Sequence, residues 1–198
     1  MKHLALIQSS ILAFAGLILT TAAASALVIV VGSTKGQECF VAARQSPDLT
    51  RLAQDAAIKV CNEALSDGNM ASHDIVGTYV NRGVLYAAQG RQQEAMNDYQ
   101  HGIRLSPDLG DAYVDRGAAL IFLKQYDDAI VDINKGINLG LSYPHVGYYN
   151  RAVAEFLKGQ YKESYFDYKR ALEINPYFKQ AEDQLKNFVV TKVPAKGS

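Results

Sequence analysis

Three arginines are the residues of this chain best suited to chemistry, because each has an aspartate at a constant distance along the sequence. A ladder of guanidinium groups could bind carboxylates or phosphates, whose oxygens match the guanidinium fork. A partner at a fixed offset in every unit instead favours structural pairing between two helices. Partly exposed ion pairs contribute only about 0–1 kcal/mol each to the stability of the fold. We therefore expect these pairs to set the register of the two helices rather than to add much stability. The pairs are Arg82 with Asp98, Arg116 with Asp132, and Arg151 with Asp167.

The other polar residues offer little for catalysis. The histidines outside the N-terminal segment stand apart in the sequence, and the chain lacks the H-E-x-x-H, G-x-S-x-G, P-loop and dinucleotide-binding motifs. We therefore predict a protein with no catalytic residue, no metal site and no cofactor. The alternative is an enzyme that uses Glu155, His145 or His101. Glu155 is the most unusual acid, and we interpret it as a mark of an irregular unit.

The arginines belong to a longer repeated pattern. The segments YVNRGVLY (79–86), YVDRGAAL (113–120) and YYNRAVAE (148–155) align, and the alignment extends over units counted from Val76, Gly110 and His145. Small residues recur at positions 8, 20 and 27 of each unit, and large residues at positions 4 and 24. This spacing predicts two helices whose backbones approach closely at the small residues. The short connections between them predict antiparallel hairpins.

This pattern resembles the tetratricopeptide repeat, which has a 34-residue period with an aromatic residue, a glycine, an alanine and a final proline at fixed positions. The resemblance covers 76–176, in units 76–109, 110–143 and 145–178. It implies an all-α fold, a right-handed superhelical stack of helix hairpins. The sequence departs from the family pattern in its tyrosine at position 4 and its arginine at position 7. One extra residue also precedes the third unit.

Weaker helical patterns flank the three units. Residues 37–66 are interpreted as a degenerate leading hairpin, 177–190 as a capping helix and 191–198 as a flexible tail. Cys39 and Cys61 are the only cysteines, and in an oxidising compartment we expect them to form one disulfide worth roughly 3 kcal/mol. Two buried free thiols are the alternative.

The N-terminus has the layout of a secretory signal peptide over 1–26, with cleavage after Ala24 or Ala26. Because the apolar character continues to Val31, an uncleaved membrane anchor over 4–31 is the alternative. In both cases we expect residues 33–198 outside the cytosol, in the periplasm or secreted. The layout is similar to that of secreted bacterial tetratricopeptide repeat proteins that carry a cysteine pair ahead of NRG repeats.

The resemblance also implies a concave groove lined by the first helices. With 20 basic and 20 acidic residues, the chain gives no reason to expect nucleic acid as its partner, and membrane contact is expected only for an uncleaved anchor. We expect an extended or helical protein segment as the ligand. The alternative is a self-associating envelope protein whose groove holds its own chain or a second copy. About half of the groove positions could instead be core between repeats. The groove positions are Val80, Asn81, Val84, Val114, Asp115, Phe122, Tyr149, Asn150 and Val153.

Overall fold

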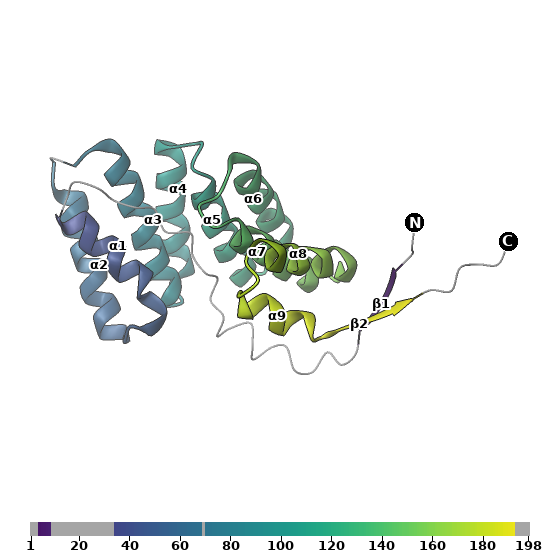
Figure 1. Cartoon of the computed structure of the whole chain (residues 1–198). Helices are drawn as coiled ribbons and strands as arrows, with labels where there is room; N and C mark the ends of the chain where they lie inside the picture. Colours follow the sequence, from purple (N-terminus) through teal and green to yellow (C-terminus); the bar gives the residue numbers. More distant parts are fainter. Residues whose placement is uncertain (1–3, 9–33, 69, 193–198) are drawn as a thin grey trace.

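The computed structural model describes residues 4–8, 34–68 and 70–192. These residues form nine α-helices, a short 3-10 helix and two strands, and the helices follow one another as antiparallel hairpins stacked in chain order (Figure 1). The expected all-α stack is confirmed. The hairpins are α1 (Thr34–Arg44) with α2 (Arg51–Ser66), α3 (Ser72–Ala88) with α4 (Gln92–Leu105), α5 (Gly110–Phe122) with α6 (Tyr126–Leu139), and α7 (Pro144–Leu157) with α8 (Tyr161–Ile174).

The two helices of a hairpin meet where the first lacks a side chain. A Cβ on Gly83 of α3 would lie 2.6 Å from the ring of Tyr99 on α4, and one on Gly117 would lie 2.6 Å from Ile133 on α6. Position 8 of each unit therefore accommodates the large residue at position 24, and Tyr99 and Ile133 are fully buried. This close approach is the packing that the small residues predict.

Each of the three hairpins from α3 to α8 turns through a residue in the left-handed conformation at position 15 of its unit. Glycine supplies this conformation in two of the units, at Gly90 (φ 77°) and Gly159 (φ 80°), and Lys124 (φ 60°) supplies it in the middle unit. Glycine adopts a positive φ without steric cost, whereas a side chain such as that of Lys124 is disfavoured there.

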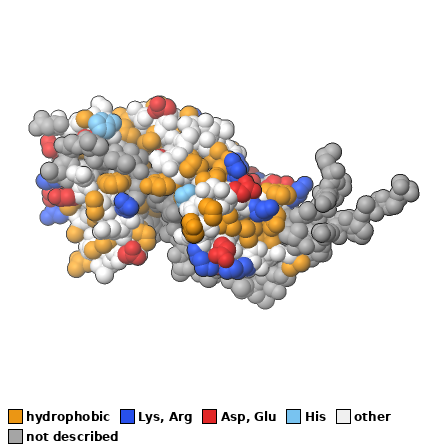
Figure 2. All heavy atoms as spheres, in the orientation of Figure 1, with side chains coloured by type: hydrophobic (Ala, Val, Ile, Leu, Met, Phe, Trp, Pro, Cys, Tyr) orange, Lys and Arg blue, Asp and Glu red, His pale blue; other side chains and the backbone are white. Residues whose placement is uncertain are grey.

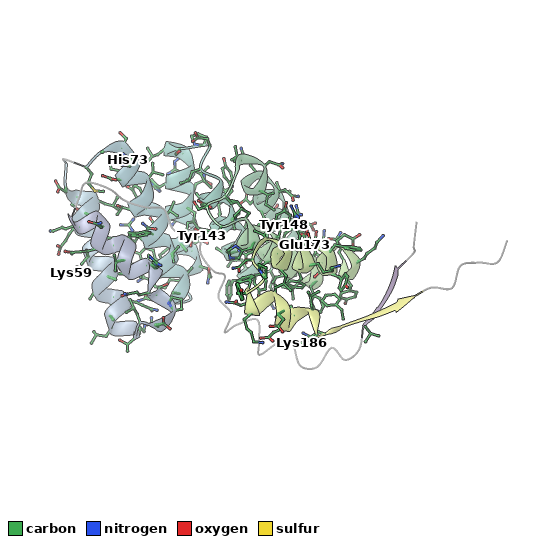
Figure 3. All side chains as sticks on the ribbon, viewed as in Figure 1. Lys59, His73, Tyr143, Tyr148, Glu173 and Lys186 are labelled. Carbon is green, nitrogen blue, oxygen red and sulfur yellow. A yellow bond between two sulfur atoms is a disulfide. The ribbon has the colours of Figure 1, made fainter. Side chains whose placement is uncertain are left out.

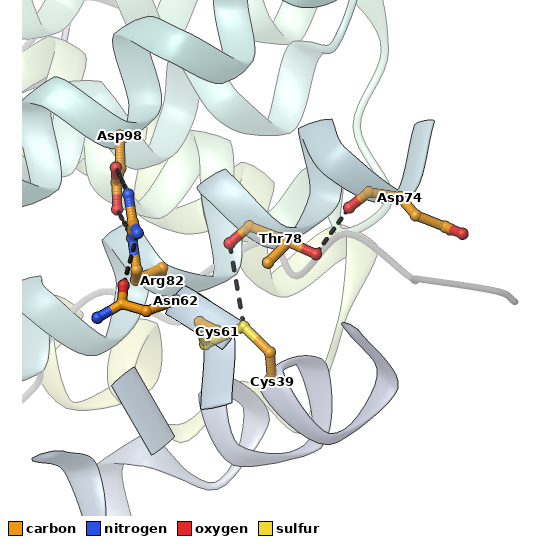
Figure 4. The surroundings of a disulfide bond; sticks show 7 residues. All are labelled: Cys39, Cys61, Asn62, Asp74, Thr78, Arg82 and Asp98. Carbon is orange, nitrogen blue, oxygen red and sulfur yellow. Dashed lines mark hydrogen bonds and ion pairs between the residues drawn. A yellow bond between two sulfur atoms is a disulfide. The ribbon is translucent and has the colours of Figure 1, made fainter. Parts of the chain in front are cut away.

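The leading hairpin is joined by a disulfide between Cys39 of α1 and Cys61 of α2 (Figure 4). Both cysteines are fully buried, and Cys61 stands at the position that Tyr99 and Ile133 occupy in later hairpins. The Cys39 sulfur lies 3.9 Å from the carbonyl oxygen of Thr78 on α3. A 3-10 helix, η2 (Ser46–Asp48), connects α1 to α2. The disulfide thus joins the two helices of the leading hairpin, and its Cys39 sulfur lies against the first complete unit.

Replacing both Cys39 and Cys61 with alanine is expected to lower the free energy of unfolding by about 3 kcal/mol, because the cross-link restricts the unfolded chain. Denaturant unfolding with and without reductant measures the loss. Reductant should destabilise the wild-type chain to the same degree and leave the double variant unchanged. A wild-type chain indifferent to reductant would show that the disulfide contributes nothing.

The C-terminal end differs from the predicted cap. The helix expected over 177–190 is present only as α9 (Lys179–Leu185), which packs on α8. Residues 188–192 form β2 (Phe188–Lys192), which pairs antiparallel with β1 (Leu4–Gln8). β2 contains two valines and a threonine, which favour a strand over a helix. Residues 191 and 192, expected in a flexible tail, therefore belong to a strand.

The N-terminal expectations fall mostly outside the described residues. Of the expected signal peptide over 1–26 and the alternative anchor over 4–31, only β1 is described, and the rest of both segments lies outside. Residues 193–198 of the expected tail also lie outside. Among the helices that the structure does describe, none is both long and apolar enough to cross a bilayer.

Candidate binding groove

The predicted groove residues all lie on the first helices of the three complete hairpins. In Figure 1 these helices stand beside one another, and α3 and α7 each pack against α5. Each helix supplies three of the nine residues that define the candidate groove. They are Val80, Asn81 and Val84 on α3, Val114, Asp115 and Phe122 on α5, and Tyr149, Asn150 and Val153 on α7.

Polar side chains form one row within the candidate groove. Asn81, Asp115 and Asn150 occupy position 6 of their units and have exposed fractions of 0%, 2% and 2%. Their neighbours at position 5 are also buried, and of the nine groove residues only Phe122 keeps intermediate exposure. Amides and carboxylates in an apolar surface can fix the backbone of a bound segment by hydrogen bonds.

The three Arg–Asp pairs join the helices of each hairpin. In each pair, Nε and one terminal nitrogen of the arginine donate to the two carboxylate oxygens of the aspartate. The distances are 2.7 and 2.7 Å for Arg82, 2.6 and 2.8 Å for Arg116, and 2.6 and 2.9 Å for Arg151. The side chains of these pairs are mostly buried, so removing one partner would leave an uncompensated charge and cost more than breaking an exposed pair.

The same arginines also connect neighbouring hairpins. The remaining nitrogen of each guanidinium donates to a side-chain amide oxygen on the second helix of the preceding hairpin, and Figure 4 shows this for Arg82 and Asn62. Sequence reasoning missed this contact, although an amide recurs at position 25 of each preceding unit. The three contacts are Arg82 with Asn62 (2.6 Å), Arg116 with Gln100, and Arg151 with Asn134 (2.6 Å).

The ring of the tyrosine at position 4 also contacts the arginine of the same unit. Its ring lies 5.3–5.5 Å from the guanidinium carbon of the position-7 arginine in all three units. A second basic group, at position 26, lies on the same ring: His101 stacks on Tyr79, and the Lys135 ammonium is 4.7 Å from the Tyr113 ring. Cation–π attraction accounts for an electron-rich ring at this position.

The connection that contains the extra residue before the third unit is held by an acid of the second unit. The backbone N–H and the hydroxyl of Ser142 donate to the carboxylate of Asp111, at 3.1 and 2.6 Å. Asp111 is itself buried on α5. The irregular connection between α6 and α7 is therefore fixed against the stack.

Glu155 lies at position 11 of the third unit, beside the Arg151–Asp167 pair. Burial, and after it the neighbouring Asp167, raise the pKa of its carboxyl, and Arg151, whose Nε is 4.0 Å away, partly offsets them, so that the pKa is about 7. One carboxyl oxygen makes no hydrogen bond to a described residue. A carboxyl in these surroundings keeps its proton to a higher pH than an exposed carboxyl does.

The Glu155→Gln variant is expected to be less sensitive to pH than the wild-type chain. Because the pKa of Glu155 is raised above its ordinary value of 4.5, the folded state binds more protons between about pH 4.5 and 7, and wild-type stability falls as the pH rises through this window. At pH 8 the variant should be more stable than the wild type by about 1–2 kcal/mol. Denaturant unfolding at pH 5 and pH 8 gives the difference, and an unchanged difference would contradict the assignment.

Residues 76–109 and 145–178 each match the sequence model of the tetratricopeptide repeat family. The chain contains tetratricopeptide repeats. A yeast relative from Saccharomyces cerevisiae, small glutamine-rich tetratricopeptide repeat-containing protein 2, is 34% identical over 80 residues, 40% of this chain and 23% of its own length. Human RNA polymerase II-associated protein 3 is 30% identical over 105 residues, 53% of this chain and 16% of its own. The chain thus spans less than a quarter of either relative.

Solved structures have the same fold. The first repeat domain of Spaghetti (RPAP3), bound to the HSP90 peptide SRMEEVD, has a TM-score of 0.53 and 27% identity, covering 56% of this chain and 89% of that one. MamA has a TM-score of 0.57 and 20% identity, covering 72% of this chain and 80% of its own. In the described part of the chain, no group of three potential ligand side chains is placed to hold a metal ion.

Proposed function

We propose that this chain is a non-catalytic scaffold that binds a segment of another protein in the candidate groove. The observation that carries the proposal is the row of polar side chains at position 6, set among apolar residues on three adjacent first helices. A segment laid across these helices would bury its apolar side chains on the valines and give its backbone to the amides and the carboxylate. The first repeat domain of Spaghetti (RPAP3), which has the same fold, is bound to a peptide, and this supports a peptide or protein segment as the ligand.

The groove chemistry favours an apolar or basic segment over an acidic one. The nine groove residues include Asp115 and no lysine or arginine. The peptide bound by the Spaghetti domain ends in Glu-Glu-Val-Asp, whose carboxylates Asp115 would repel. On the face shown in Figure 2 acidic and basic side chains are interspersed, which supports a protein ligand rather than nucleic acid.

We also propose that the protein works outside the cytosol, in the periplasm or after secretion. The Cys39–Cys61 disulfide and the apolar N-terminal sequence support this location. Fractionation of cells that express the full chain, with mass spectrometry of its N-terminus, tests the location. Recovery of the reduced, uncleaved chain from the cytosol would contradict it.

Selection from a displayed peptide library, using the chain from residue 33 onward, tests the groove. Asn81→Ala and Asn150→Ala should each weaken a selected peptide about five- to tenfold, because each removes one or two hydrogen bonds. Val131→Ala on α6, a side chain 66% exposed, should leave the affinity unchanged. If the unsubstituted chain and the three variants bind the selected peptide with equal affinity, the binding surface lies elsewhere.

A further inference from the structure

The leading hairpin has an outer face at one end of the stack. α1 and α2 form this end, and Figure 3 marks the two ends of the stack by Lys59 on α2 and Lys186 beyond α9. A pocket of about 500 Å³ lies on the outer face, between the two helices. We call this surface the end face and define it by Glu38, Val41, Ala42, Gln45, Ala53 and Ala57.

Two contacts place α1 in register with the first helices of the complete units. Cys39 is bonded to Cys61 at position 24, and in the first two complete units position 24 packs against position 8. Lys35 donates to Glu63 at 2.8 Å, and these residues then hold positions 4 and 26, which also meet in the complete units. Both contacts agree that Cys39 stands at position 8. Val41 therefore stands at position 10.

Position 10 shows what the end face lacks. In the complete units the residue at this position is buried, with exposed fractions of 0% for Leu85, 2% for Ala119 and 0% for Ala154. Val41 is 45% exposed. Each first helix of a complete unit packs against the second helix of the preceding hairpin, α2 on α3, α4 on α5 and α6 on α7. The repeat itself therefore indicates that the element suited to the end face is an α-helix.

The covering helices α2, α4 and α6 share a pattern that defines a suitable helix. Position 25 accepts from the arginine at position 7 of the next unit, and position 18 pairs with position 14, as in Asp55 with Gln89 (2.7 Å) and Asp127 with Lys158. Positions 18, 21, 25 and 28 lie on one face of a helix. Apolar residues occupy positions 21 and 28 of this face. They are Ile58 and Leu65 on α2, Met96 and Ile103 on α4, and Ile130 and Ile137 on α6.

The end face differs from the later hairpins in its charge. Its residue at position 7 is the exposed Glu38 instead of an arginine, and Val60 stands at position 23 instead of an aspartate. A carboxylate attracts a lysine or arginine at position 25 of a covering helix, where α2, α4 and α6 carry an amide. Gln45, at position 14, can donate to or accept from position 18 of that helix.

Helix α8 has the required pattern but is already covered within its own chain. Tyr165, Lys169 and Leu172 stand at its positions 21, 25 and 28. α9 packs on α8, and the ring of Phe188 lies 5.7 Å from that of Tyr165. A second copy of the chain would have to displace these C-terminal elements before its α8 could cover the end face. A helix of another protein has no such obstacle.

We propose that the end face binds an amphipathic α-helix of another protein. This helix carries two apolar residues seven positions apart, with a lysine or arginine four positions after the first of them. It adds one helix to the stack, as α2 does for α3, and its basic residue pairs with Glu38. The site is separate from the candidate groove and does not depend on the proposed function.

Binding of a synthetic peptide to the full chain tests the proposal. The peptide has the sequence of α8, Tyr161–Ile174, which carries the required pattern, and a hydrocarbon staple on its opposite face holds it helical. Val41→Asp should weaken binding by about tenfold or more, because it places a charge in the apolar centre of the end face. Val131→Asp, at a side chain of α6 that is 66% exposed, should leave the affinity unchanged.

Exchange of charges tests the predicted contact of Glu38. Glu38→Lys should weaken the native peptide about fivefold, and a Lys169→Glu peptide should bind this variant about as tightly as the native peptide binds the native chain. Absence of binding by the native peptide, or equal binding to the Val41→Asp variant, would overturn the proposal. Sedimentation of the full chain gives a further check. Self-association that Val41→Asp abolishes would identify a second copy as the occupant and would also overturn it.

Discussion

The Arg116→Gln variant is expected to lose about 3 kcal/mol of unfolding free energy, because the substitution leaves the buried Asp132 without its cation. Arg116 and Asp132 side chains are 16% and 12% exposed, and the arginine also donates to Gln100 of the preceding hairpin. One substitution therefore removes a contact within a hairpin and a contact between hairpins. Denaturant unfolding measures the loss.

Two further variants distinguish the loss of the Arg116 contacts from the effect of removing any positive charge. Arg170 pairs with Glu173 at the surface, where both side chains are more than half exposed, so Arg170→Gln should cost less than about 0.5 kcal/mol. Adding Asp132→Asn to Arg116→Gln should recover part of the loss, because the uncompensated carboxylate is removed. If Arg116→Gln loses no more unfolding free energy than Arg170→Gln, the contacts of Arg116 with Asp132 and Gln100 do not contribute to stability.

The Gly110→Ala variant is expected to lose about 3 kcal/mol, because a Cβ on Gly110 would overlap backbone that has little freedom to move. The added carbon would lie 2.7 Å from the carbonyl oxygen of Gly136 and closer still to that of Gly140. These oxygens belong to the end of α6 and the connection that follows it. For a chain of this size, the loss corresponds to a fall in Tm of about 6–12 °C.

Gly68→Ala is the matched control for the Gly110 substitution. A Cβ on Gly68 would meet nothing within 4 Å, so this variant should stay within about 0.5 kcal/mol of the wild type. Equal stability of the two alanine variants would contradict the close approach of α5 and α6.

The sequence predicted the repeat architecture well because each unit repeats the same local constraints. Gly83 and Gly117 must accommodate Tyr99 and Ile133, so the spacing of small and large residues specifies how a hairpin packs. The Arg–Asp offset of 16 residues follows from the same geometry. The amide contact from Arg116 to Gln100 was missed because it joins two units, and no single unit contains both groups.

The ends of the stack and the candidate groove were harder to predict. Leu185 stands where the arginine of a fourth unit would be, but α9 ends at this residue and the strand β2 follows. The burial of Asp115 also depends on what lies over α5, which the pattern of one helix does not specify. Sequence periodicity identifies the face that a helix presents but not the group that covers it.

The most direct test of the central claim is the map of backbone amide chemical-shift changes when a library-selected peptide is titrated into the isotopically labelled chain from residue 33 onward. Binding in the candidate groove predicts that the largest changes fall on α3, α5 and α7, around Asn81, Asp115 and Asn150. Changes confined to α4, α6 and α8, or spread evenly over both layers, would contradict a binding surface on the first helices.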